Sequence, residues 1–146
     1  MNNADVLPLK AKGPVMPAPI LEGPAQIAST AIGSWTGVVS ATHWDLYDRV
    51  KINGADFYVD DKELGHIHLD GEVHLATSRP LREALVSAGL AEPFRWYESW
   101  SQFRIRDAAG AEHATWLFKL NYDRLRGVPA ERLMERIAAR GQDVTG

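Results

Sequence analysis

The sequence predicts a single-domain α+β protein in which a curved antiparallel sheet carries helices packed on one face. Between positions 38 and 75, short apolar or alternating runs are separated by turn signals, which is typical of antiparallel strands. Beyond position 75, capped helical patterns surround one further strand. The 146 residues are 45% hydrophobic and 24% charged, which suits one compact domain. The order strands, helix, strand, helix, helix favours the α+β class.

The first part of the chain differs in composition from the rest. Four prolines and two glycines fall before position 24, and no helical or strand period is sustained there. Proline removes a backbone donor and prevents a regular helix. We therefore expect residues 1–23 to form a proline-rich arm or tail laid over the domain, and residues 24–146 to form the domain itself.

Local signals predict the first elements of the domain. Residues 25–32 show a short helical pattern that Gly33 ends. We expect strands over three segments, separated by turns at Asn53-Gly54 and Asp60-Asp61. These segments are residues 38–40, 47–52 and 56–59. Together with the hairpin that follows, they predict an antiparallel meander.

Helix caps and breakers predict the second half of the domain. A serine precedes the first helix as its N-cap, and glycines follow each helix. In chain order, these elements are a helix between Ser78 and Gly89, an extended segment over 94–97, a strand over 100–106, a helix over 111–126 and a helix over 129–139 that Gly141 closes.

Three of the five histidines lie in one predicted hairpin, residues 65–75. Imidazole titrates near neutrality and is the commonest metal ligand, so such a group can move a proton or hold a metal. Side chains alternate between the faces of a strand. His66 and His68 therefore share a face, however the hairpin turns.

The position of the third histidine, His74, depends on the turn. If Asp70-Gly71 is a two-residue turn, His74 lies on the face opposite the other two. If residues 69–71 form a three-residue loop with Gly71 in a left-handed conformation, His74 and Glu72 join the first two histidines on one face. The sequence leaves both geometries open.

The second geometry makes a metal site conceivable. His66, His68 and His74 with Glu72 would offer three nitrogens and one oxygen to iron, manganese, nickel or zinc. The spacing of the first two histidines and the glutamate resembles that of a cupin metal site, although a cupin takes its last histidine from a distant strand. A divalent transition metal is thus the alternative to a site without a cofactor.

Composition excludes several classes of function. The chain has no cysteine, which excludes disulfides, thiolate metal sites and cysteine nucleophiles. Its net charge of -3 argues against nonspecific binding to nucleic acid or anionic membranes. No apolar run reaches membrane-spanning length, and the first residues lack the order of a signal peptide. We therefore expect a soluble, cytoplasmic protein.

Several motifs resemble the fungal luciferase family, a luciferase-like domain found mostly in uncharacterised bacterial proteins. The resemblance covers roughly residues 56–126. The fungal enzymes carry an additional amino-terminal hydrophobic region that this chain lacks, and their turn between the histidines is longer, so Glu72 has no counterpart. The motifs that carry the resemblance are Lys62-Glu63-Leu64-Gly65-His66-Ile67-His68, Val73-His74-Leu75-Ala76, Glu98-Ser99-Trp100-Ser101-Gln102-Phe103 and Asn121-Tyr122.

The resemblance implies an oxygenase. Fungal luciferases add molecular oxygen to the pyrone 3-hydroxyhispidin, and the resulting endoperoxide loses carbon dioxide. No organic cofactor is needed, because the deprotonated substrate can supply an electron to oxygen. The chemistry needs a base, hydrogen-bond donors and an apolar pocket. The resemblance assigns the base and the donors to His66, His68 and His74, and the partners are then a small aromatic or enol substrate and oxygen.

The pocket of such an enzyme would need apolar and cationic side chains near the hairpin. Trp100 and Phe103 fall in a matching motif, and Trp96 lies just before it. Arg104 is a candidate to bind a substrate carboxylate. These four residues are the predicted substrate-binding set.

A non-catalytic interpretation stays open beside the enzymatic one. The order of elements also resembles the small double-wing α/β family, whose members are presumed to bind DNA or other partners. A basic surface with aromatic residues among it would then be expected. Its arginines would be Arg79, Arg82, Arg95, Arg104 and Arg106. No pattern indicates the oligomeric state.

Overall fold

The computed structural model describes residues 7–45, 47–48 and 50–145. None of the helices in this described part is long and apolar enough to cross a membrane. In chain order the elements are the 3-10 helix Leu9–Lys12, α1 (Pro24–Gly33), β1 (Val38–Trp44), β2 (Ile52–Val59), β3 (Lys62–His68), β4 (Glu72–Leu75), α2 (Arg79–Ser87), β5 (Glu92–Pro93), β6 (Ser101–Arg104), α3 (Ala108–Leu125) and α4 (Ala130–Thr145).

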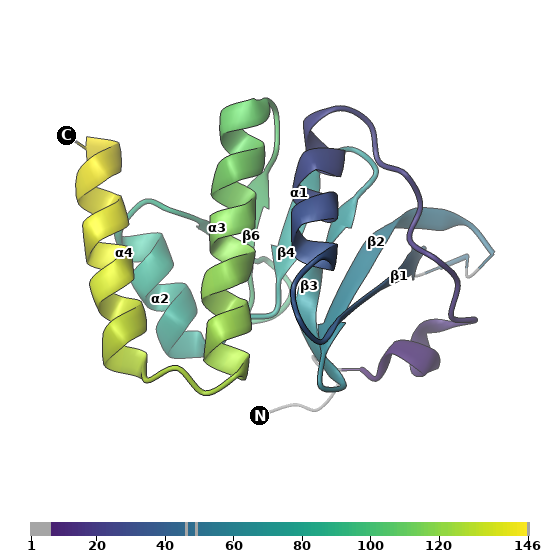
Figure 1. The fold of residues 1–146 in the computed structure, drawn as a ribbon, viewed down its shortest axis with the longest axis horizontal. Coiled ribbons are helices and arrows are strands. Elements are labelled where there is room, and N and C mark those ends of the chain that lie inside the picture. Colours follow the sequence, from purple (N-terminus) through teal and green to yellow (C-terminus); the bar gives the residue numbers. More distant parts are fainter. Residues whose placement is uncertain (1–6, 46, 49, 146) are drawn as a thin grey trace.

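The strands form one antiparallel sheet in the order β1-β2-β3-β4-β6-β5. Figure 1 shows α1 and α3 side by side on one face of this sheet, with α2 and α4 packed together beyond the β6 end. The predicted α+β class is confirmed. Because the helices lie on one side, the two faces of the sheet meet different surroundings.

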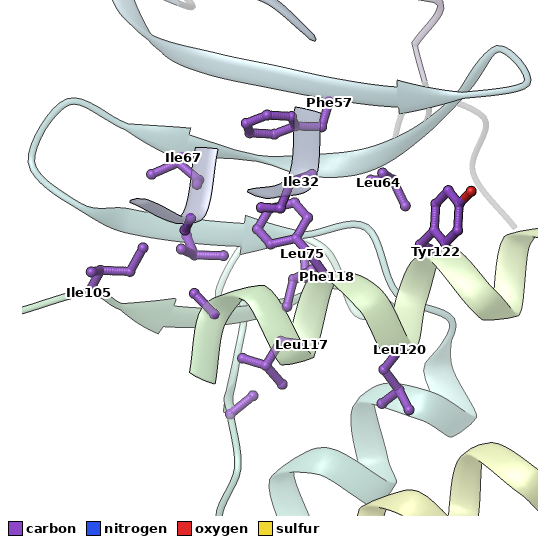
Figure 2. Close-up of a cluster of buried hydrophobic side chains, with 14 of the residues drawn as sticks. Ile32, Phe57, Leu64, Ile67, Leu75, Ile105, Leu117, Phe118, Leu120 and Tyr122 are labelled. Carbon is purple, nitrogen blue, oxygen red and sulfur yellow. The ribbon is translucent and has the colours of Figure 1, made fainter. Parts of the chain in front are cut away.

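The helix-covered face of the sheet holds the hydrophobic core. Phe57 of β2, Ile67 of β3 and Leu75 of β4 are fully buried there. They pack towards Ile32 of α1 and Phe118 of α3, as Figure 2 shows. Each such side chain contributes about 1.5–3 kcal/mol to stability on burial. The residues between them in sequence point to the other face, which carries the polar groups described below.

A β-bulge interrupts the alternation in β3. Phe57 pairs with Gly65 and the next residue, Tyr58, pairs with Glu63, so Leu64 is the extra residue. A Cβ at Gly65 would lie 2.4 Å from the carbonyl oxygen of His74, so the close approach of β3 and β4 requires glycine there. Because of this extra residue, side chains before and after the bulge in β3 alternate out of phase, so Glu63 points to the same face as His66.

The described part of the amino-terminal arm lies against β1 and β2. The backbone N–H of Thr42 donates to the carbonyl of Met16 at 2.8 Å, and its hydroxyl donates to the carbonyl of Pro17 at 2.7 Å. The hydroxyl of Tyr58 donates to the carbonyl of Leu7 at 2.6 Å. The arm thus crosses the edge of the sheet and reaches the face opposite α1 and α3.

Two predictions around the first hairpin are wrong. Asn53-Gly54 lies inside β2 and forms no turn. The turn comes earlier, where the carboxylate of Asp45 accepts hydrogen bonds from the backbone of Tyr47 and Asp48. This side chain satisfies the backbone locally, so the described residues 47, 48, 50 and 51 do not continue a strand. Position 49 of that predicted strand lies outside the described residues.

The predicted end of the last helix at Gly141 is also wrong, because α4 runs on to Thr145. A glycine inside a helix costs only about 1 kcal/mol, which packing can offset. A Cβ at Gly141 would lie 3.5 Å from that of Ala88, so the glycine sits where α4 approaches the end of α2.

Candidate active site: a histidine and carboxylate cluster

The structure decides the turn of the histidine hairpin in favour of the three-residue loop. His66 pairs with His74 across β3 and β4. Gly71 has φ +90° and its N–H donates to the carbonyl of His68 at 2.9 Å, as a bulged turn requires. The three histidines of the hairpin therefore share the face of the sheet opposite α1 and α3.

The three rings of the hairpin are in direct contact. Nδ1 of His74 lies 3.1 Å from Nε2 of His66 and 3.1 Å from Nε2 of His68. His66 is buried, and the other two rings are half-buried. One ring nitrogen of His74 is thus the meeting point of all three side chains.

A fourth histidine, His43 of β1, joins them. Its ring stacks on that of His66 with centroids 3.9 Å apart, and lies 5.1 Å from the ring of His68. In the sheet, Gly54 lies between His43 and His68. Because glycine has no side chain, the two rings can meet across it. We call His43, His66, His68 and His74 the histidine cluster.

Two buried carboxylates hold rings of the histidine cluster. Asp56 accepts from Nδ1 of His43 at 2.8 Å, and Glu63 accepts from Nδ1 of His66 at 2.9 Å. Asp56 pairs with His66 in the sheet, so both face the same side. Glu63 reaches that side only because of the bulge at Leu64. The sequence analysis missed both residues. Gly65 inside a predicted strand was the available sign of a bulge.

The amino-terminal arm supplies a cation to these carboxylates. Nζ of Lys12 lies 2.8 Å from Glu63 and 3.2 Å from Asp56. Burial by itself would lower the pKa of Lys12, but the two carboxylates outweigh it and raise the pKa. The pKa of Glu63 is raised, because burial opposes its charge more than the lysine favours it. One oxygen of Asp56, Oδ2, is buried without a hydrogen-bond partner among the described residues.

Burial lowers the pKa of every histidine in the hairpin, with neighbouring histidines adding to the effect. The pKa of His68 falls to about 4 and that of His74 to about 3. The pKa of His66 falls well below its ordinary value, by burial first and then by the proximity of His43 and His68. These imidazoles are therefore neutral at neutral pH and present lone pairs.

An aromatic cluster borders the histidine cluster on the side of β4. Its members lie in or just before the motif of residues 98–103. The ring of Phe94 lies 4.4 Å from that of His74, and the ring of Trp100 lies 5.9 Å from that of His66. Tyr97 packs on Trp100 with centroids 5.1 Å apart. Trp100 and Phe94 are buried, so this aromatic cluster forms a wall behind the histidines.

A surface hollow of about 360 Å³ opens beside the histidine cluster. It gives small molecules a direct approach to two of the four rings. Its lining residues are Asn53, His68, Leu69, Asp70, Glu72 and His74.

The remaining predicted substrate-binding residues lie elsewhere. Phe103 pairs with Val73 on the helix-covered face, and its ring lies 4.8 Å from that of His113. Trp96 is 72% exposed and contacts Arg95. The structure brings neither residue to the histidine cluster.

Glu72 and Arg104 lie at the rim of the cluster. The guanidinium of Arg104 lies 3.0 Å from the carboxylate of Glu72 and 3.4 Å from that of Asp70. Nε2 of His74 is 3.8 Å from Glu72. The glutamate of the predicted metal set is therefore already paired with an arginine.

Most of the arginines considered for a nucleic-acid surface have partners in the protein. Arg79 pairs with Glu98, and Arg82 donates to the carbonyl of Tyr97 at 3.0 Å. Arg104 pairs with two carboxylates, as described above. These contacts reduce the positive charge that such a surface would present.

Fold and site together define a small α+β protein with a buried cluster of histidines and carboxylates on one face of an antiparallel sheet. The family model described as Luciferase domain matches residues 61–121, a segment that runs from the turn before β3 into α3. This match supports membership of the luciferase-like family, as the resemblance of the sequence predicted. Searches of curated proteins and of solved structures gave no significant match.

Proposed function

We propose that this protein is a small-molecule oxygenase of the luciferase-like type. In this proposal, an oxidisable pyrone- or enol-like substrate binds beside the histidine cluster and reacts with molecular oxygen without an organic cofactor. The observation that carries the proposal is the hollow of about 360 Å³ lined by His68 and His74, within the segment that matches the luciferase domain. Pockets of roughly 300–1,000 Å³ are typical of small-molecule sites.

The proposed reaction begins with removal of the enol proton. His68 is the best-placed base, because it is half-buried, lines the hollow and contacts His74. Its low pKa opposes protonation in the free protein. An enolate formed beside it would stabilise the imidazolium as an ion pair and so raise that pKa.

The enolate then supplies the two electrons of the new carbon–oxygen bond, and oxygen is reduced to the peroxide level. This step needs a site that keeps water away from the charged intermediate. The buried rings of Phe94 and Trp100 exclude water on one side of His74 and His66. The guanidinium of Arg104, at the rim, can favour an anionic substrate.

Oxygen uptake with hispidin-like pyrones and related enols tests this proposal. Loss of a general base costs about 10²-fold or more in rate, so a His68→Gln variant should be slower by that factor. His113 lies in α3, outside the cluster, so His113→Gln is the matched control and should keep the wild-type rate. A wild-type rate no higher than that of His68→Gln would refute the catalytic role.

A further inference from the structure

Two groups of potential metal ligands meet at His66. One consists of Asp56, Glu63 and His66, and the other of His43, His66 and His68; in each group, one ligand atom per residue lies within 4.8 Å of the others. The set that contains Asp56 and Glu63 already binds a cation, because the ammonium of Lys12 lies against both acids. The set of three histidines has no lysine or arginine in the same position among the described residues.

The carboxylates determine which nitrogens of the cluster carry protons. An ionised carboxylate only accepts hydrogen bonds, so with both acids ionised Nδ1 of His43 and Nδ1 of His66 are the protonated nitrogens. In a neutral imidazole the other nitrogen is then an acceptor. Nε2 of His43 and Nε2 of His66 therefore carry lone pairs. A carboxylate that orients a histidine in this way is the usual outer partner of a metal ligand.

The contacts of His74 leave these lone pairs incompletely satisfied. Its Nδ1 lies 3.1 Å from Nε2 of both His66 and His68. If Nδ1 of His74 carries a proton, that one proton must serve two acceptors. If it carries none, its lone pair faces that of His66. A cation bound by His43, His66 and His68 would remove the competition of His66 and His68 for this one nitrogen.

The spacing of the nitrogens suits a transition metal. At a Zn–N distance of about 2.0 Å, two nitrogens of a tetrahedral site lie about 3.3 Å apart. The ligand atoms of His43, His66 and His68 lie within 4.8 Å of one another, so small side-chain movements would bring them to that spacing. Imidazole ligands favour zinc, copper, nickel and iron, and the chain has no cysteine that would select a softer ion. The hollow lined by His68 and His74 provides the route by which an ion enters.

The buried charges around the cluster also favour a cation. With both acids ionised, Asp56 and Glu63 carry two negative charges, and Lys12 balances one of them. Oδ2 of Asp56 is fully buried and has no hydrogen-bond partner among the residues that the structure describes. This unpartnered oxygen is an observation independent of the rings, and it leaves one acceptor of the acid layer open behind them.

We propose that the histidine cluster binds one divalent first-row transition metal ion through ring nitrogens of His43, His66 and His68, whose ligand atoms lie within 4.8 Å of one another. Asp56 and Glu63 are positioning residues that orient two of these rings. Of the set considered from sequence, His66 and His68 remain, and His43 takes the place of Glu72 and His74. This site goes beyond the proposed oxygenase function, which requires no metal, and metal binding is measured without any substrate.

Calorimetric titration of the EDTA-treated full chain with Zn²⁺ tests the proposal. We expect one ion per chain with a dissociation constant in the micromolar range or tighter. His43→Gln and His68→Gln should each weaken binding by at least 10-fold. Asp56→Asn should weaken it about 10–100-fold with the same stoichiometry, as loss of an outer partner does. His113, the one histidine outside the cluster, provides the control, and His113→Gln should bind as wild type does.

A second measurement needs no variant. Co²⁺ bound by the wild-type chain should give the intense visible bands of a low-coordinate ion and paramagnetically shifted imidazole N–H signals. No Zn²⁺ binding by the wild-type chain would overturn the proposal. Equal affinity of the wild type and His43→Gln, or loss of binding in His113→Gln alone, would also overturn it. Oxygen uptake by the EDTA-treated protein is scored separately, so failure of either proposal leaves the other intact.

Discussion

Acidification should destabilise the metal-free protein through the histidine cluster. In an unfolded chain these histidines bind a proton near pH 6.5, whereas in the folded protein His68 and His74 stay neutral down to a pKa of about 4 and about 3. Between these limits the unfolded state binds more protons, so the free energy of unfolding falls as the pH falls. The contribution is complete above pH 6.5 and is lost towards pH 3–4.

The magnitude follows from the two pKa values. At pH 5, folding excludes a proton from each ring at a cost of about 2 kcal/mol, or about 4 kcal/mol for the pair. This is a large part of the roughly 5–15 kcal/mol that stabilises a typical domain. The buried His66 adds to the loss. Glu63, with its raised pKa, acts in the opposite direction.

A comparison with His74→Gln isolates one ring from these other groups. Urea unfolding in the presence of EDTA, at pH 7.5 and pH 5.0, gives the change in free energy for each protein. Glutamine takes up no proton, so the wild type should lose about 2 kcal/mol more than the variant over this interval. Equal losses in the two proteins would refute the assignment of a half-buried, neutral imidazole at position 74.

Two further substitutions test the surroundings of the cluster. Lys12→Met should lower the free energy of unfolding by about 3–5 kcal/mol, because it leaves Asp56 and Glu63 without their cation. Lys10→Met, on the exposed side of the same 3-10 helix, is the control and should change the free energy of unfolding by less than about 0.5 kcal/mol. Equal effects of the two substitutions in urea unfolding would show that Lys12 does not stabilise the two acids. Gly71→Ala should cost about 2–4 kcal/mol, since its Cβ would lie 2.6 Å from the carbonyl oxygen of Ile105 at φ +90°. Gly89→Ala, at φ +73° with no atom within 4 Å of the new Cβ, is the control for backbone strain alone. Equal losses of stability in the two variants, measured by thermal or urea unfolding, would contradict the steric reasoning.

Local signals in the sequence predicted the elements that satisfy their backbone locally. Ser78 was predicted as an N-cap, and its side chain accepts from the N–H of Leu81 at 3.3 Å. Asp60-Asp61 was predicted as a turn, and both residues have positive φ. Asn53-Gly54 carries an equally strong signal, yet it lies inside β2. There the pairing of β2 with both of its neighbours decided the conformation.

The alternation of side chains places two of the four histidines, His66 and His68, on one face, and it places neither of the two acids there. A bulged turn was needed to add His74. The same alternation puts Glu63 on the opposite face, and only the bulge at Leu64 brings it back. His43 and Lys12 come from β1 and from the arm, far along the chain, and no local pattern connects them to the hairpin.

By itself, the sequence determined the class of fold, the face shared by His66 and His68, and the resemblance to the luciferase-like family. These depend on periods of a few residues and on short motifs, which are properties of neighbours along the chain. The tertiary structure alone decided that four rings meet, that two buried acids orient them and that Lys12 balances those acids. Contacts of this kind depend on strand register and on the path of the arm, and both are set by packing between distant segments.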